Sequence, residues 1–139
     1  MKKFLYVFLI FTFLSCGVSF ACFTKKNNSV ILFNNHPITE QNIMDNSVEF
    51  PKGERIYYII TMPKFQYSRK LYIQIFKQDN ALGQMGYKLV WSRDVKLKNE
   101  ETTYYTDYVV LNSSGSYVMQ VYSKDRPTKL YSRQEFWVR

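Results

Sequence analysis

The sequence predicts an all-β protein, an antiparallel sandwich of about seven to eight strands that follows an N-terminal signal peptide. Three observations support this. Short runs after residue 29 alternate apolar with polar residues, turn residues separate the runs about every 8–12 positions, and no window keeps apolar residues at helical spacing. The connections are also too short for helical crossovers between parallel strands, which excludes a doubly wound sheet.

Composition excludes several other classes. A length of 139 residues favours one folded domain, and an aromatic content of 18% is too high for a disordered chain. Two cysteines cannot form a disulfide scaffold, one histidine cannot form a His-rich metal site, and five glycines leave no Gly-rich phosphate loop. We therefore expect no cofactor and no metal.

The N-terminal segment has the pattern of an export signal. Two lysines, Lys2 and Lys3, precede an apolar run from Phe4 to Leu14, and small residues follow. That run is too short for a comfortable membrane span. The predicted organisation is a signal at 1–22, a tether at 23–29 and a β-sandwich domain at 30–139.

Both cysteines lie at the end of this signal. Phe13-Leu14-Ser15-Cys16 resembles the box that precedes the lipidated cysteine of spirochaete-type bacterial lipoproteins, although Phe13 and Ser15 depart from its strict form. The resemblance implies that Cys16 carries the lipid, with Cys22 as the alternative after Ser19-Phe20-Ala21. Plain secretion is one alternative, because Ser19-Phe20-Ala21 also resembles an ordinary cleavage site, and an uncleaved anchor is another.

The first four predicted strands are short apolar runs that end at turns. In the third run Ile56, Tyr58, Ile60 and Met62 share one face, and Pro63 ends it. The loop 78–86, which holds two glycines, follows the fourth run. The four predicted strands are 29–33, 47–50, 55–62 and 70–77.

The last four predicted strands include a long run rich in tyrosine and valine at 103–111. In the first of them Tyr87, Leu89 and Trp91 are expected to share a face that Val95 and Leu97 continue. The final two are expected to bury alternate residues, which are Tyr117, Met119 and Val121 in one and Phe136 and Val138 in the other. The four strands are 87–92, 103–111, 116–123 and 130–138.

One stretch favours a particular kind of sandwich. The sequence from Leu111 to Val121 resembles the tyrosine-corner region of immunoglobulin-like and fibronectin-III-like domains, in which Gly-x-Tyr opens a late strand. The resemblance implies that Gly115 and Tyr117 form this corner and that the Tyr117 hydroxyl bonds backbone upstream. Met119 occupies the slot of an antibody cysteine, which excludes true antibody-type domains but not the wider class.

The sequence offers no catalytic constellation. His36 lies in a turn without a nearby nucleophile or acid, and the adjacent Glu100 and Glu101 point different ways in a turn. Asp107 is mid-strand and is unremarkable if it faces outward. We therefore expect no enzymatic activity.

The outer face of the predicted strands is rich in aromatic and basic residues. Tyrosine, tryptophan and arginine are the types enriched at binding hot spots, so a partner-binding face is expected there. Alternatively, the loop 78–86 or residues 30–50 fold over these side chains and make a second small core. The candidate binding residues are Tyr72, Tyr122, Tyr131, Arg133, Trp137 and Arg139, and alternation places Tyr57 and Phe76 on outer faces too.

Charge and export together limit the partners. Removing Lys2 and Lys3 leaves 17 basic residues against 11 acidic ones, so the formal charge falls from +8 to +6. Export argues against nucleic acid and favours a membrane reached through the lipid anchor, another envelope protein or an acidic glycan. The prediction is a non-enzymatic, lipid-anchored protein of the cell envelope that acts as an interaction or scaffold module or as an adhesive one, with the membrane unspecified. The alternatives are a soluble periplasmic accessory or inhibitor-like domain and a carrier of a small ligand.

Overall fold

The computed structural model describes residues 29–62, 69–80, 86–98, 103–124 and 129–139. The signal segment, both cysteines and residues 23–28 of the expected tether lie outside the described residues. The pair Glu100 and Glu101 lies outside them as well. The described residues therefore belong to the folded domain.

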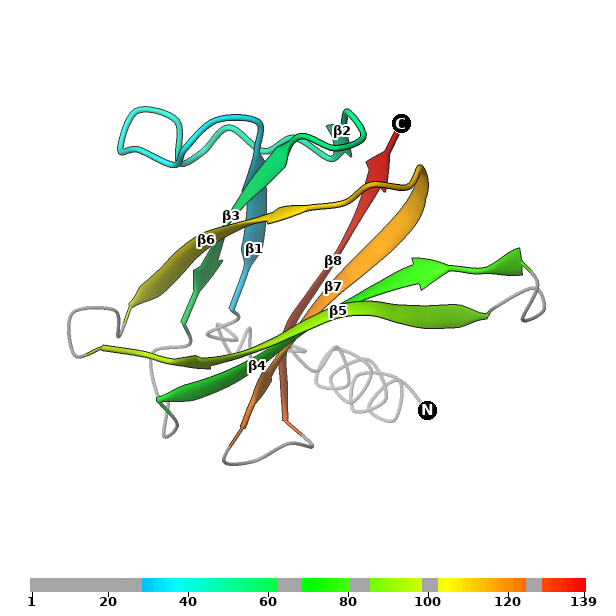
Figure 1. Ribbon diagram of the computed structural model, residues 1–139. Helices are drawn as coiled ribbons and strands as arrows, with labels where there is room; N and C mark the ends of the chain where they lie inside the picture. Colours follow the sequence, from blue (N-terminus) through cyan, green and yellow to red (C-terminus); the bar gives the residue numbers. More distant parts are fainter. Residues whose placement is uncertain (1–28, 63–68, 81–85, 99–102, 125–128) are drawn as a thin grey trace, which may run out of the picture.

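The described chain forms two packed β-sheets (Figure 1). One sheet has the strand order β1-β3-β6 and the other has the order β2-β8-β7-β4-β5. Every pair is antiparallel except β2 with β8, which is parallel. The predicted all-β sandwich is confirmed. The strands are β1 (Ile31–Asn34), β2 (Glu49–Phe50), β3 (Arg55–Thr61), β4 (Lys70–Gln78), β5 (Tyr87–Lys96), β6 (Tyr104–Val110), β7 (Gly115–Ser123) and β8 (Leu130–Val138).

Alternating side chains from both sheets fill the space between them. The expected inward residues of β3, β4, β7 and the end of β8 are buried, among them Tyr58, Ile73 and Met119. Three phenylalanines join the layers at one end, since the Phe33 and Phe136 ring centroids are 4.7 Å apart and Phe50 meets both edge-on at 6.1 Å. Such aromatic contacts add to the free energy of burial.

The expected common face of β5 is wrong. Ile75 pairs with Trp91 and Phe76 with Leu89, so one extra residue lies in β5 at this shift of register. A bulge of this kind reverses the side-chain alternation. Trp91 therefore packs against the core, whereas Tyr87 and Leu89 lie on the opposite face and are 41% and 44% exposed.

A second shift of register affects β8. Val121 pairs with Ser132 and Tyr122 with Leu130, which leaves Tyr131 at the irregularity. Tyr131 is half-buried and packs against the core, which differs from the outward position expected from simple alternation. Beyond the shift the expected alternation holds, because Phe136 is buried and Trp137 is exposed.

The structure contains the hydrogen bond that the tyrosine-corner resemblance implies. Tyr117 is buried, its hydroxyl donates to the Ser113 carbonyl, and its ring stacks on Phe136 at 5.6 Å. Gly115 begins β7 with φ +150, and a Cβ there would lie 2.7 Å from Cε of Lys77. Glycine suits this position because other residues rarely adopt such a φ.

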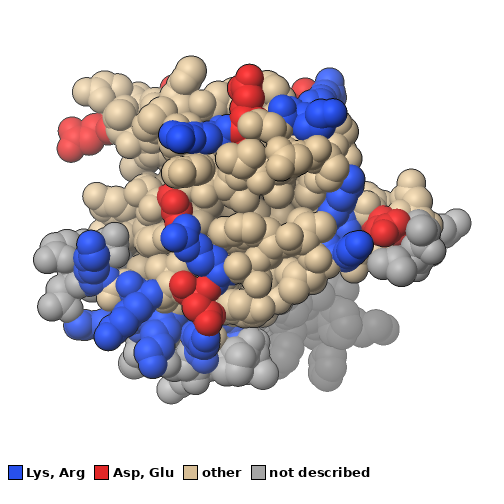
Figure 2. Space-filling view, viewed as in Figure 1, with Lys and Arg blue, Asp and Glu red and all other residues tan. Residues whose placement is uncertain are grey.

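The surface charge is uneven. Figure 2 shows Lys and Arg gathered at the lower left, where Figure 1 places the beginning of β4 and the end of β5. Elsewhere in this view basic and acidic side chains are interspersed among uncharged ones.

Candidate functional site

The outer face of the five-stranded sheet is the candidate site. We define this outer face as the side of β4, β5, β7 and β8 that points away from the three-stranded sheet. Half-exposed aromatic and polar side chains alternate there with the buried residues of the core. Its main members are Tyr72, Gln74, Phe76, Tyr87, Leu89, Val118, Gln120, Tyr122, Arg133, Glu135 and Trp137.

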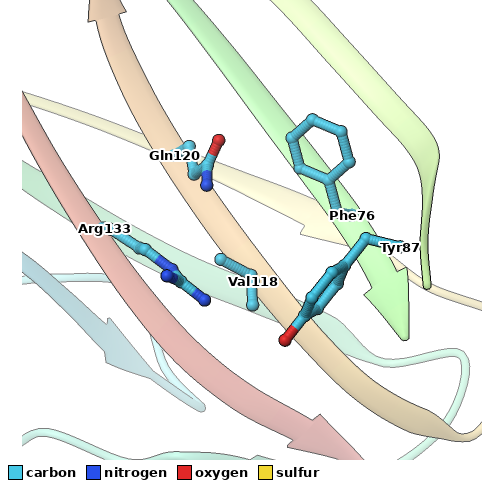
Figure 3. A pocket seen from close by; sticks show the side chains of 5 residues that line it. All are labelled: Phe76, Tyr87, Val118, Gln120 and Arg133. Carbon is cyan, nitrogen blue, oxygen red and sulfur yellow. The ribbon is translucent and has the colours of Figure 1, made fainter. Parts of the chain in front are cut away.

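A hollow of about 260 Å³ lies in the middle of this outer face. Val118 is 2% exposed, and Figure 3 shows it between the Arg133 guanidinium and the Tyr87 ring. Phe76 and Gln120 complete the lining, so four neighbouring strands contribute. The hollow is slightly smaller than most sites for drug-sized ligands. It suits one side chain of a partner, with apolar walls and a cation at the rim.

The two polar side chains of the hollow, Gln120 and Arg133, make only local, partly exposed contacts within the described residues. Gln120 and Arg133 are directly opposite each other on β7 and β8, and the Gln120 amide oxygen accepts a hydrogen bond of 2.8 Å from the Tyr122 hydroxyl. Arg133 pairs with Glu135 at 3.1 Å, and both side chains are about half exposed. An ion pair this exposed stabilises the fold very little. The guanidinium can therefore exchange Glu135 for a carboxylate of a partner at small cost.

The predicted binding residues do not all meet at the hollow. Tyr72 and Tyr122 are direct cross-strand neighbours beside it, and Trp137 is 41% exposed further along β8. Arg139 lies beyond the end of β8 and pairs with Glu49 at 2.6 Å, and Tyr131 packs against the core. The outer face therefore includes Tyr72, Tyr122, Arg133 and Trp137 of the predicted set.

Three lining residues were missed by reasoning from sequence, namely Tyr87, Val118 and Gln120. Alternation predicts that Tyr87 shares a face with Trp91 and Val95, because the bulge that separates them in β5 leaves no mark on simple alternation. Val118 and Gln120 do lie at outward positions of β7, but neither is an aromatic or charged residue that would have drawn notice. Alternation alone could have included them.

Residues 81–85 of the loop 78–86 lie outside the described residues, and the described residues do not cover the whole outer face as a second core would require. Tyr87, Leu89 and Trp137 all remain more than two-fifths exposed. From the segment 30–50, Pro37 and Ile38 instead line a smaller hollow of about 180 Å³ with Tyr57 and Tyr108. Tyr57 itself belongs to the three-stranded sheet, where its ring lies 5.8 Å from that of Tyr108.

A polar cluster lies between the two sheets at their open edge. Asp107 faces inward on β6, not outward, and forms an ion pair with Arg93 of β5. The Tyr105 hydroxyl donates to the same carboxylate at 2.9 Å. Burial, reinforced by the Asp107 charge and by Tyr105, raises the pKa of the Tyr58 hydroxyl, which has no hydrogen-bond partner within the described residues. This cluster ties the sheets together and contains no nucleophile with a base.

The described part of the chain shows no metal-binding cluster and no membrane-spanning helix. His36 is exposed in the turn where the sequence places it. Within residues 29–62, 69–80, 86–98, 103–124 and 129–139, no group of three or more His, Cys, Asp or Glu side chains could hold a metal ion. The same residues include no helix that is long and apolar enough to cross a membrane.

Comparison with known proteins identifies the fold. An immunoglobulin-like protein from Pseudomonas aeruginosa aligns with a TM-score of 0.52 and 16% identity, over 79% of this chain and 92% of that one. The described chain has an immunoglobulin-like fold. The soluble domain of PmoD from a Methylocystis species aligns with a TM-score of 0.45 and 11% identity, over 80% of this chain and 90% of that one. No family model and no curated protein matches the sequence.

Proposed function

We propose that this chain is a non-enzymatic interaction module of the bacterial cell envelope, held at a membrane by a lipidated cysteine. The outer face of the five-stranded sheet binds its partner, another envelope protein. One observation carries this: an aromatic-walled hollow with Arg133 at its rim stays open on a sheet face whose neighbours are also half-exposed aromatics. Exposed aromatic patches beside arginine are typical of protein interfaces.

The chemistry of the hollow favours a particular kind of partner. Phe76, Tyr87 and Val118 offer apolar contact for an aliphatic or aromatic side chain. Arg133 offers two parallel donors to a carboxylate next to it. A partner segment that presents an apolar residue beside an acidic one would satisfy both. An acidic glycan would use Arg133 but would leave the apolar lining unfilled.

The anchor is supported by the sequence before the domain. Cys16 and Cys22 end an apolar run behind two lysines, and the folded domain that follows holds no cysteine. About three acyl chains at one cysteine make an effectively permanent anchor, since each buried CH₂ contributes about 0.8 kcal/mol.

Palmitate labelling of growing cells tests the anchor. We expect incorporation into the wild type and into Cys22→Ser, and none into Cys16→Ser. Each variant keeps the apolar run of the signal, so both should still be exported. Detection of each variant in the envelope fraction is therefore the control. Absence of label from the wild type would contradict lipidation, and loss in Cys22→Ser alone would move the anchor to the second cysteine.

Pull-down of envelope proteins tests the outer face. We expect Trp137→Ala and Arg133→Ala to weaken capture of the partner by about 30-fold, the effect of a hot spot of about 2 kcal/mol. Tyr108→Ala is the matched control, because Tyr108 is 42% exposed on the other sheet. Unchanged capture by both variants, with folding verified by circular dichroism, would exclude this face as the binding surface.

A further inference from the structure

One end of the sandwich holds the point at which the chain enters the domain. Ser29 precedes β1, and its hydroxyl donates to that of Ser132 near the beginning of β8 at 3.1 Å. The Val30 carbonyl accepts a hydrogen bond of 2.9 Å from Thr61, the last residue of β3. The beginnings of β1 and β8 and the end of β3 therefore lie together. We call this the entry end.

Basic residues mark the same end of the five-stranded sheet. Three backbone hydrogen bonds join the strand ends there, from Ser123 to Lys129, from Lys124 to Lys70 and from Leu97 to Arg69. Each of these bonds involves a lysine or an arginine. The described cations of the entry end are Arg69, Lys70, Lys96, Lys98, Lys124 and Lys129.

The opposite end has no such excess. At the entry end the described acidic residue is Asp94, which pairs with Lys124. Around the opposite end five basic residues face five acidic ones, and the remaining described charges form the pairs Arg93–Asp107 and Arg133–Glu135. The five and five are Lys52, Arg55, Lys77, Lys88 and Arg139 against Glu40, Asp45, Glu49, Glu54 and Asp79. All of the net positive charge of the described residues thus lies at the entry end.

The adjoining segments do not cancel this charge. The sequence joins the entry end to 23–28, 63–68, 99–102 and 125–128. Together these segments contain four basic residues and three acidic ones, so they add one positive charge. The difference between the two ends is therefore one of net charge, and it does not depend on any cation being unpaired. The basic residues of the entry end contribute to the blue cluster in Figure 2.

We propose that the entry end lies against an anionic phospholipid surface, so that the domain is oriented on its membrane and not merely tethered to it. This rests on the lipid anchor of the proposed function. From Cys22 or Cys16 to Ser29 is 7 or 13 residues. At 3.3–3.6 Å per residue the chain reaches at most roughly 25–45 Å, so the end carrying the net charge is also the end through which the domain is held near the bilayer.

The electrostatics favour contact once the anchor is in place. Attraction between a lysine and an anionic leaflet is felt within about 8–10 Å at moderate salt, a range that a short tether keeps accessible. The lipid holds the domain at the membrane, and the basic patch adds an electrostatic contact with anionic headgroups that orients it. In this orientation the outer face of the five-stranded sheet points sideways, away from the lipid surface, and stays open to a partner.

Lysine footprinting of the purified lipidated chain tests the orientation. The chain is reconstituted in phosphatidylglycerol-containing vesicles or in phosphatidylcholine vesicles, and acetylation by a water-soluble reagent is read by mass spectrometry. We expect labelling of Lys70, Lys96 and Lys129 to fall about fivefold in the anionic vesicles and to recover at high salt. Lys52, Lys77 and Lys88 are internal controls whose labelling stays constant.

Two double variants compare charge reversal at the entry end with charge reversal at the opposite end. Lys96→Glu with Lys129→Glu should abolish the protection of Lys70, whereas Lys52→Glu with Lys88→Glu should leave it intact. A chain that joins neither vesicle contradicts the lipid anchor and this orientation with it. A chain that joins both vesicles with equal labelling overturns the orientation alone. Protection by soluble dextran sulfate but not by phosphatidylglycerol would also overturn it, in favour of an acidic glycan.

Discussion

Phe136 and Trp137 are consecutive residues of β8, yet they face opposite sides of the five-stranded sheet. Phe136 is fully buried and its ring lies 4.7 Å from that of Phe33 in the other sheet. Trp137 is 41% exposed, and its backbone partners are Ser116 and Glu49. Folding alone explains the inner aromatic. It does not explain the outer one, and that difference is the reason for assigning function to the outer face.

Truncating both residues should give the largest contrast. Phe136→Ala removes a fully packed ring from the core and should lower the free energy of unfolding by about 3–5 kcal/mol. Trp137→Ala removes a half-exposed ring and should lower it by less than about 1 kcal/mol. Urea denaturation measures both values. Equal losses would show that Trp137 is a core residue and that the two faces are not distinct.

Two tyrosine hydroxyls extend the comparison on β7. The Tyr117 hydroxyl is on the inner side and donates to the Ser113 carbonyl, so Tyr117→Phe should lower the free energy of unfolding by about 1 kcal/mol. The Tyr122 hydroxyl is on the outer face and donates only to the Gln120 side chain among the contacts described, so Tyr122→Phe should change it by less than about 0.5 kcal/mol. The reverse order in thermal or urea denaturation would contradict the assignment of the tyrosine corner.

A third contrast lies on β3. The Tyr58 hydroxyl is buried with its pKa raised, so the folded state holds this proton more tightly than the unfolded state does. The associated stability is complete below the ordinary tyrosine pKa of about 10 and is lost as the pH rises above it. Tyr58→Phe should keep or raise stability at neutral pH by up to about 1 kcal/mol and reduce the alkaline loss. The control is Tyr57→Phe on the outer side of the same strand, and identical alkaline profiles for wild type and Tyr58→Phe would contradict this.

Much of the fold was predictable, because alternation fixes which residues a strand buries. It placed Ile56, Tyr58 and Ile60 of β3 correctly, and it placed Phe136 opposite to Trp137. It failed where a strand changes register. The bulges opposite Phe76 and beside Tyr131 exchange the inner and outer faces, and single-sequence alternation has no signal for them. The inward position of Asp107 was left open, since its ion-pair partner Arg93 belongs to a strand of the other sheet.

The same limits applied to the candidate site. Residue type was enough to single out Arg133 and Trp137, but the hollow exists only because β4, β5, β7 and β8 are neighbours in the sheet. Tyr87 reaches it through the bulge of β5. Neither strand order nor the position of a bulge can be deduced from composition or spacing.

Photocrosslinking in living cells tests the central claim most directly. A benzophenone amino acid is placed at Trp137 or at Tyr108, which are 41% and 42% exposed on the outer sides of the two sheets. We predict a discrete adduct with another envelope protein from position 137, its loss when Arg133→Glu is added, and no such adduct from position 108. The same adduct from both positions, or none from position 137, would contradict the claim that the outer face of the five-stranded sheet is the interaction surface.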